Sequence, residues 1–73
     1  MSNTKSIIDE TIKSHDVVLY MKGTKSMPQC GFSSRVAGVL NYMEVDYQDI
    51  NVLADENIRQ GIKDYSDWPT IPQ

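Results

Sequence analysis

One side chain in this sequence stands out for its reactivity. Cys30 is the only cysteine of the 73 residues, and it lies in a segment, 22–33, that contains two glycines and a proline. The apolar run at 17–21 before it is typical of a buried strand, and the amphipathic run at 32–43 after it is typical of a helix. Cys30 is therefore expected at a helix N-terminus, just beyond the carboxyl end of a parallel strand, where open α/β sheets bind ligands.

Unpaired N–H groups and the helix dipole at such a position favour the thiolate, which is the nucleophilic and metal-binding form of cysteine. The alternative is that Cys30 is a small buried apolar residue, as many lone cysteines are. Against that alternative, Cys30 follows a Pro28-Gln29 turn and precedes Gly31, which leaves room for a ligand to approach. The sequence thus predicts a thiol site with one cysteine.

Ser33 narrows the chemistry of this thiol. It occupies the position at which a C-x-x-C redox motif has its second, resolving cysteine. A serine hydroxyl cannot attack a mixed disulfide, so an oxidised Cys30 needs an external thiol to regenerate it. Ser33 can equally be an ordinary residue of the first helical turn, and both interpretations can hold. The serine at this position argues against a dithiol oxidoreductase.

Metal binding at Cys30 needs ligands from outside the chain. Iron–sulfur clusters take four ligands, usually thiolates, so two chains and two small thiols would complete the set. A zinc site is disfavoured, because the only histidine, His15, precedes the strand at 17–21 and Cys30 follows it. An extended strand of that length spans roughly 20 Å. A catalytic Cys–His pair is therefore not expected, and His15 is predicted to lie, exposed to solvent, at the C-terminus of a helix.

The elements that position the thiol are predicted in the order helix, strand, helix, strand, helix. Thr4 is expected to cap a first helix that ends at His15-Asp16, with Ile8 and Ile12 on its buried side. A strand at 17–21 follows, and then the second helix at 31–43. The predicted apolar face of that second helix consists of Phe32, Val36, Val39, Leu40 and Met43.

A second strand is predicted at 45–50 from its period-two alternation. Asn51 is expected to cap a third helix, which ends near Asp64, and the two prolines of residues 66–73 exclude a helix there. A strand, a helical crossover and a second strand form a βαβ unit, so the two strands are expected to be parallel. Two strands alone make too small a sheet, so a third strand is expected to begin at the end of the sequence.

The composition sets further limits. The chain is long enough for one small domain, with 40% hydrophobic and 23% charged residues. Its net charge of −3 argues against nucleic acid or an anionic membrane as the main partner. No apolar run approaches the roughly 20 residues of a membrane span. With one cysteine and no signal or transit peptide, a reducing cytoplasm is the expected setting.

Three motifs, in this order and spacing, resemble those of the monothiol glutaredoxins of the CGFS type. They are Lys22-Gly23-Thr24, then Pro28-Gln29 followed by Cys30-Gly31-Phe32-Ser33, and finally Trp68-Pro69-Thr70-Ile71-Pro72-Gln73. The resemblance implies an α/β, thioredoxin-like fold, in which a four-stranded mixed sheet has helices on both faces. Residues 1–73 are then expected to be a single glutaredoxin domain, truncated after the third helix and the start of the third strand, with its last strands and helix missing.

The resemblance also implies roles for individual residues. Cys30 would be the catalytic thiol and the ligand of a [2Fe–2S] cluster shared with a second chain. Lys22 and Arg59 would bind the glycine carboxylate of glutathione, and Ile71, before a cis Pro72, would pair its backbone with the cysteine of glutathione. From the residues alone, Lys22 also follows a strand on the thiol side, where a cation lowers the thiol pKa. Lys22 and Arg59 can still be ordinary solvated side chains.

The function implied is glutathione-dependent binding and transfer of a [2Fe–2S] cluster in iron–sulfur protein assembly and redox homeostasis. The implied partners are glutathione, a second copy of the chain when the cluster is bound, BolA-type proteins and apo iron–sulfur acceptors. The alternative is a weak glutathione-linked thiol–disulfide oxidoreductase that removes glutathione from proteins through Cys30. A third possibility is an incomplete domain with neither activity. The expected compartment is a bacterial cytoplasm, or the mitochondrial matrix after removal of a transit peptide.

Overall fold

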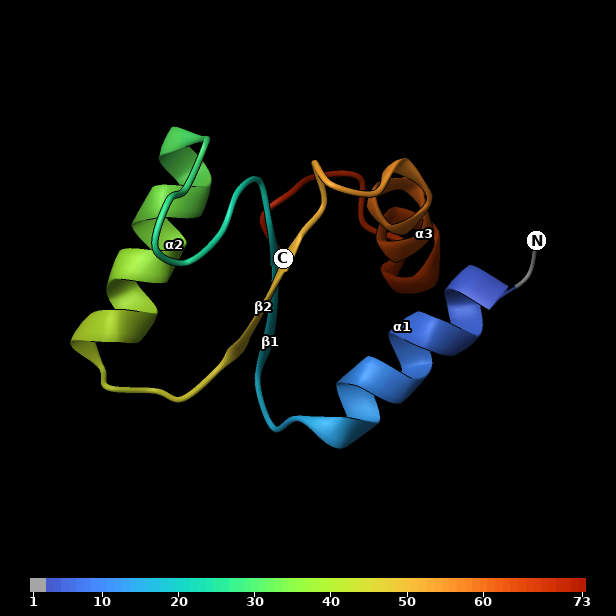
Figure 1. Ribbon diagram of the computed structural model, residues 1–73, viewed down its shortest axis with the longest axis horizontal. Coiled ribbons are helices and arrows are strands. Elements are labelled where there is room, and N and C mark those ends of the chain that lie inside the picture. The colour runs from blue at the N-terminus through green and yellow to red at the C-terminus, as the bar shows by residue number, and fades with distance from the viewer. Residues whose placement is uncertain (1–2) are drawn as a thin grey trace.

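The computed structural model describes residues 3–73 and has an α/β fold with three helices and two parallel strands (Figure 1). The predicted order of elements is confirmed. No helix in this range is long and apolar enough to cross a membrane. The elements are α1 (Asn3–Ser14), β1 (Val18–Met21), α2 (Gly31–Tyr42), β2 (Gln48–Asn51) and α3 (Glu56–Ser66).

The sheet lies between α2 on one side and α1 with α3 on the other (Figure 1). β1 and β2 pair in parallel, with Val18 opposite Gln48 and Met21 opposite Asn51, as the βαβ interpretation requires. On the other edge of β1, Tyr20 and Gln73 exchange two backbone hydrogen bonds of 2.6 and 2.9 Å. A residue pair that exchanges both bonds is the unit of an antiparallel ladder, so Gln73 pairs with this edge of β1 in the antiparallel manner.

Alternation along β1 divides the core in two, because successive side chains of a strand point to opposite faces. Tyr20 packs toward α1 and α3, whereas Leu19 and Met21 pack toward α2. Both faces of the sheet are therefore covered, which explains why β1 is almost wholly apolar. The buried cluster on the α1 and α3 side is Ile8, Tyr20, Val52, Ile62 and Ile71, and the cluster on the α2 side is Leu19, Met21, Ala37 and Tyr47.

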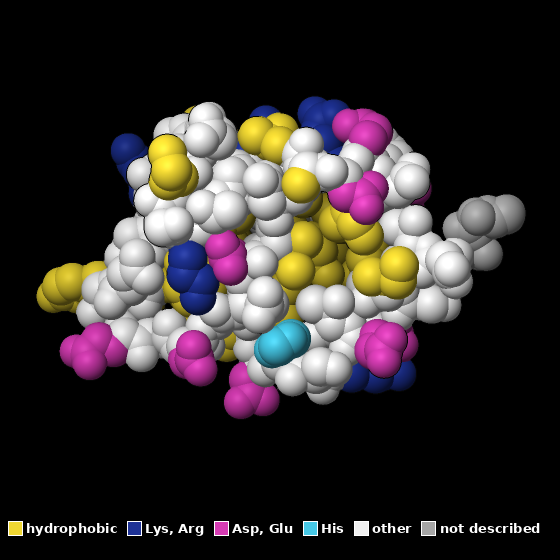
Figure 2. All heavy atoms as spheres, in the orientation of Figure 1, with side chains coloured by type: hydrophobic (Ala, Val, Ile, Leu, Met, Phe, Trp, Pro, Cys, Tyr) yellow, Lys and Arg dark blue, Asp and Glu magenta, His cyan; other side chains and the backbone are white. Residues whose placement is uncertain are grey.

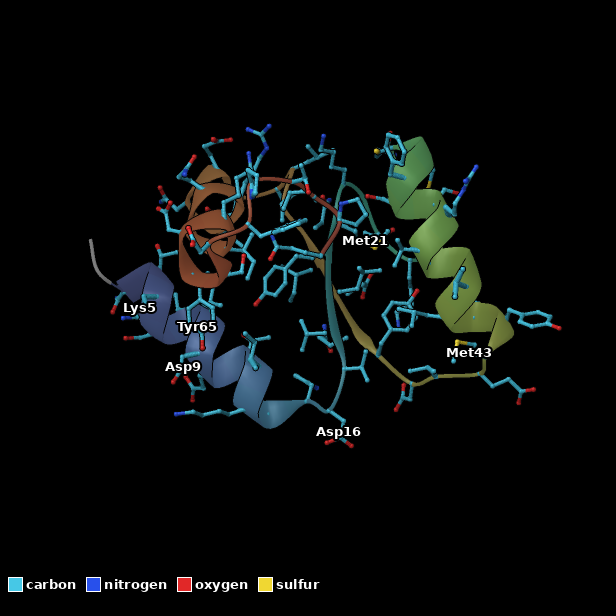
Figure 3. The ribbon with its side chains drawn as sticks, turned by 180° about the vertical axis from the view of Figure 1, so that it is seen from behind. Lys5, Asp9, Asp16, Met21, Met43 and Tyr65 are labelled. Atoms are coloured by element: carbon cyan, nitrogen blue, oxygen red, sulfur yellow. The ribbon has the colours of Figure 1, made fainter. Side chains whose placement is uncertain are left out.

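α1 and α3 pack closely against each other. Gly61 lies against the methyl group of Thr4, and a Cβ atom at Gly61 would clash with that methyl group. The hydroxyl of Tyr65 donates a 2.8 Å hydrogen bond to Asp9, and the two side chains point toward one another (Figure 3). The prediction that Thr4 caps the first helix is wrong, because α1 already includes Asn3 and Thr4 faces α3.

The predicted buried face of the second helix is partly wrong. Phe32, Val39 and Met43 are exposed, and the side chains buried in α2 are instead Ser33 and Ala37. Ser33 is turned inward because its hydroxyl accepts a hydrogen bond from the backbone N–H of Lys22. This contact rotates the helix, so that the face centred on Ser33 and Ala37 meets the sheet, with Val36 and Leu40 half-buried beside it.

The second strand and third helix begin later than predicted. Asn51, expected as the helix cap, is still paired with Met21 in the sheet. The cap is Asp55, whose carboxylate accepts hydrogen bonds from the N–H groups of Asn57 and Ile58 at 2.9 and 3.4 Å. Both residue types are good caps, so only the position of the strand decides between them. The third helix ends at Ser66 and not near Asp64.

Candidate functional site

The thiol of Cys30 lies at the N-terminus of α2. Its backbone is extended, with φ −148° and ψ 139°, and its carbonyl accepts the first helical bond, from Ser34 N–H at 2.8 Å. The side chain is half-buried, and its sulfur makes no capping hydrogen bond of ordinary geometry. The predicted position of the thiol at a helix start, beyond the carboxyl end of β1, is confirmed.

The surroundings lower the pKa of the Cys30 thiol. The largest contribution comes from the backbone N–H of Ser33 and the next from that of Phe32, followed by the positive charge of Lys22 and the hydroxyl of Ser33; partial burial opposes them. Helix N-termini stabilise a thiolate in this way because their first N–H groups have no partner within the helix. The site thus favours the reactive, metal-binding form of cysteine.

Ser33 is fully buried, and its Oγ atom lies 3.0 Å from the backbone nitrogen of Lys22. The serine that replaces a resolving cysteine is therefore part of the packing between α2 and the end of β1. Its hydroxyl links the two residues of the site that come from different elements, Lys22 after β1 and Cys30 before α2. Because this residue is a serine, it offers neither a second thiol ligand nor a second thiol nucleophile.

A cavity of about 580 Å³ opens beside the start of α2. Three of the four predicted site residues, Lys22, Arg59 and Ile71, line it, and Cys30 does not, although Phe32 two residues further along does. Their roles remain predictions. The wall consists of Lys22, Phe32, Arg35, Val36, Arg59, Lys63, Pro69, Thr70, Ile71 and Pro72.

The charged groups of this wall are all cationic. Lys22, Arg35, Arg59 and Lys63 face the cavity, and no acidic residue lines it, although the whole chain has a net charge of −3. In the space-filling view, separate basic side chains lie along the upper edge, from the α2 side to the α3 side (Figure 2). A cavity with this lining selects anionic ligands.

Arg59 has a donor that nothing in the described part of the chain satisfies. Its Nε atom is buried and has no hydrogen-bond partner, while Nη1 makes only a 3.4 Å contact with the exposed carboxylate of Glu56. A buried N–H without an acceptor costs free energy, and such groups are rare in folded proteins. Arg59 lines the cavity, so this donor belongs to a side chain of the cavity wall.

Arg35 and Lys63 were not predicted as site residues. Lys63 follows Arg59 by four residues on α3, and that spacing places both on one helix face. For Arg35 the sequence contains no comparable signal. It lies off the buried face of α2 and is exposed, as expected, but α2 is oriented so that this exposed side adjoins the cavity.

The segment before Gln73 completes the wall. The peptide bond between Ile71 and Pro72 is cis, as predicted. Ile71 is buried among residues of the α1 and α3 side, and the side-chain amide of Gln73 donates to the carbonyl oxygens of Trp68 and Thr70 at 3.2 and 3.0 Å. These bonds hold the segment in a compact turn that presents Pro69 to Pro72 to the cavity.

His15 lies away from the thiol, as predicted. It follows α1, where the chain approaches β1, whereas the loop with Cys30 begins where the chain leaves β1. In Figure 2 the histidine is at the lower edge, beneath an apolar area between the sheet and the two helices α1 and α3. Within residues 3–73, no group of three or more His, Cys, Asp or Glu side chains could hold a metal ion.

Comparison with known proteins agrees with this geometry. Residues 17–73 match the family model described as Glutaredoxin. The chain is 54% identical over 70 residues to a monothiol glutaredoxin, ycf64-like, of Synechocystis sp., an alignment that covers 96% of this chain and 65% of that protein. It is 51% identical to the probable monothiol glutaredoxin 2 of Rickettsia prowazekii, with 100% of this chain and 70% of that protein covered.

Solved structures show the same fold. The solution structure of reduced poplar apo GrxS14 superposes with a TM-score of 0.80 at 49% identity, and that of a monomeric truncated mutant of Trypanosoma brucei 1-C-Grx1 with 0.84 at 45%. Each comparison covers 94% of this chain and 63% of the other, so this chain spans under two thirds of their length. By family model, identity and fold, the chain belongs to the monothiol glutaredoxin family of the thioredoxin-like superfamily.

Proposed function

We propose that this chain binds glutathione in the cationic cavity and presents its thiol beside Cys30. Glutathione has two carboxylates, and the cavity wall has four cations and no acidic residue. The observation that carries the proposal is this wall of four cations, which Lys22 and Arg59 approach from different elements of the fold. A carboxylate would accept from Arg59 and Lys22, and charge-assisted bonds of this kind are about twice as strong as neutral ones.

The proposed cargo of the site is a [2Fe–2S] cluster. Each chain offers a single thiolate, Cys30, and the hydroxyl of Ser33 is buried and hydrogen-bonded, so it is no substitute ligand. Four thiolates are reached when two chains each contribute Cys30 and one bound glutathione. Thiolate ligands suit an iron–sulfur cluster. Because each chain has only one, the proposal requires a homodimer bridged by glutathione.

In this proposal the chain is a carrier, which delivers the cluster to apo iron–sulfur proteins and pairs with BolA-type proteins. The chain's own residues favour ionisation of Cys30, orient glutathione through Lys22 and Arg59, and leave the thiol partly exposed at the start of α2. Because glutathione supplies half of the ligands and dissociates, the cluster is held less firmly than by four protein cysteines. That lability suits transfer.

Reconstitution tests the carrier function. The chain is incubated with iron, sulfide and glutathione, and the visible spectrum and the mass in solution are recorded together. The proposal predicts charge-transfer bands, a dimeric mass and the loss of both when Cys30 is replaced by serine. Bands that survive Cys30→Ser, or a coloured species that is monomeric, would contradict it.

The second candidate function is thiol–disulfide exchange, and the lowered pKa of Cys30 favours it. The Cys30 thiolate attacks the glutathione sulfur of a protein–glutathione disulfide, the protein thiolate leaves, and Cys30 becomes glutathionylated. A second glutathione thiolate then attacks that mixed disulfide, which forms oxidised glutathione and restores the Cys30 thiolate. Turnover of a glutathionylated substrate by chains without cluster favours this candidate, and a circular-dichroism spectrum typical of a molten state favours neither.

A further inference from the structure

The loop that connects β1 to the thiol has one defined shape. We call residues 22–30 the thiol loop. The N–H of Gln29 donates to the Lys22 carbonyl at 2.8 Å, Thr24 and Met27 exchange two backbone bonds, and Gly23 and Pro28 form an antiparallel bridge. Gly23 has φ 96°, and a Cβ atom there would lie 2.5 Å from the Met27 carbonyl oxygen. Only glycine fits this turn without strain.

Side chains of β2 tie this loop to the sheet. The N–H of Gly23 donates to Oδ1 of Asn51 at 2.9 Å, and the N–H of Lys25 donates to Oδ2 of Asp49 at 2.7 Å. Asp49 and Asn51 are two residues apart, so their side chains lie on the same face of the strand. Asn51 is itself fixed, because its Oδ1 also accepts from the N–H of Leu53 at 2.9 Å.

The side chain of Lys25 adds a third tie to the same face. Its ammonium group donates to the Tyr47 carbonyl at 2.7 Å and lies 4.3 Å from the centre of the Tyr47 ring. Tyr47 immediately precedes β2, and Tyr47, Asp49 and Asn51 are alternate residues, so the loop is held at three successive positions along this segment. None of the three lines the cationic cavity.

These ties bear directly on Lys22. Its N–H donates to Ser33, its carbonyl accepts from Gln29, and the next residue, Gly23, is bound by Asn51. The backbone of Lys22 is thereby fixed on both sides, and its side chain lines the cavity with Arg59. We propose that Asn51 and Asp49 are positioning residues, which hold the thiol loop on β2 so that Lys22 faces Arg59 across the site of an anionic thiol ligand.

This inference rests on the proposed glutathione site and adds residues to it that do not touch the ligand. A purely structural role for Asn51 would change stability alone. A positioning role changes how strongly the chain distinguishes a ligand with a free glycine carboxylate from one without it. Glutathione and its glycyl ethyl ester are therefore the two probes, because they differ only in that carboxylate.

The test compares wild type with Asn51→Ala and Asp49→Ala, with Tyr65→Phe as control, since Tyr65 makes one hydrogen bond at the far end of α3. Titration calorimetry gives the affinity for both probes. We expect Asn51→Ala to weaken glutathione binding about fivefold, because the loop is no longer held at Gly23 and the backbone of Lys22 is less firmly fixed. Its preference for glutathione over the ester should fall by a similar factor, while Tyr65→Phe keeps the wild-type affinity and preference.

Amide hydrogen exchange tests the loop itself without a ligand. In Asn51→Ala the Gly23 and Lys25 amides should exchange about tenfold faster, in keeping with loss of a local tie. Asn51→Asp, which keeps the Oδ acceptor, should restore slow exchange. The inference is overturned if the Gly23 and Lys25 amides exchange at the wild-type rate in Asn51→Ala. It is also overturned if these amides exchange faster while the affinity for glutathione and the preference for glutathione over the ester stay unaltered. A wild-type chain that binds no glutathione overturns the proposed function instead, and the exchange data then decide whether Asn51 holds the loop.

Discussion

At the scale of single residues, Cys30 owes its proposed chemistry mainly to backbone groups. The N–H groups of Ser33 and Phe32 lower the thiol pKa more than the charge of Lys22 does. Backbone donors are present whenever α2 begins at this residue, whatever side chains surround it. In the proposed function, the side chains of the site therefore have a different task, which is to select an anionic partner thiol.

The lowered pKa predicts a pH dependence that can be checked by alkylation of Cys30 with iodoacetamide. The thiolate is the nucleophile, so the rate should reach its plateau at a lower pH in the folded chain than in 8 M urea. An acid whose folded pKa is depressed stabilises the fold above its unfolded pKa and loses that contribution as the pH falls through the folded pKa. The unfolding free energy of wild type relative to Cys30→Ser should therefore rise with pH across this window, and a flat difference would contradict the prediction.

The unpaired donor of Arg59 predicts a large effect of its removal. Arg59→Met should weaken glutathione binding about tenfold, because a hydrogen bond to a charged group contributes about 1.5 kcal/mol. Arg35→Gln should weaken glutathione binding only about twofold, since Arg35 is exposed and its charge is screened by solvent. Lys5→Gln on exposed α1 is the charge-matched control and should bind as wild type does. Equal losses for Lys5→Gln and Arg59→Met would show that net charge alone matters.

At the scale of elements, the contact between α1 and α3 depends on the absence of a side chain at Gly61. Thr4 occupies the space that a Cβ atom would need there, and Ile8 closes the contact from the other side. Since α3 contributes Arg59 and Lys63 to the cavity, this packing also determines where the two cations lie. A glycine in the interior of a helix is unfavourable on its own, so Gly61 is retained for packing.

Two glycine-to-alanine changes should therefore have opposite effects. Gly61→Ala is expected to destabilise the chain by about 1–3 kcal/mol through overpacking against Thr4. Gly38→Ala in α2, where no atom lies within 4 Å of the added Cβ, should stabilise by about 0.5–1 kcal/mol. Urea denaturation monitored by circular dichroism measures both. Thr4→Ser combined with Gly61→Ala should recover part of the loss, and stabilisation by Gly61→Ala would refute the packing argument.

At the scale of the whole molecule, the site is divided between elements that meet only in the folded chain. Lys22 follows β1, Cys30 precedes α2 and Arg59 belongs to α3. Ile71 lies in the segment after α3, which pairs with β1 through Gln73. A ligand that touches several of these elements binds the folded state and not the unfolded one. Ligand binding and global stability are then linked.

That linkage predicts a thermal shift. Reduced glutathione at about 100 times its Kd should stabilise the chain by about 2.7 kcal/mol, which raises Tm by roughly 10–20 °C for a domain of this size. Thermal unfolding followed by circular dichroism measures the shift. Arg59→Met at the same glutathione concentration should show a clearly smaller one. A Tm independent of glutathione would mean that the folded chain has no site for it.

Much of the fold could be predicted from local patterns. The order of elements, the parallel pairing and the position of the thiol at a helix start follow from apolar periodicity and turn residues around Cys30. These features depend on short segments, and each is a property of neighbouring residues. The errors of prediction concern the ends and the buried faces of correctly predicted elements, such as the helix cap at Asp55 in place of Asn51 and the buried face of α2.

The sequence by itself determined the single thiol, the serine that replaces a resolving cysteine, and the family. Only the tertiary structure decided which exposed residues belong to the site. Arg35 adjoins the cavity and Asn51 holds the thiol loop because of the rotation of α2 and the register of β2. Rotation and register are fixed by contacts between residues distant in the chain, such as Lys22 with Ser33 and Gly23 with Asn51, and no local pattern encodes such contacts.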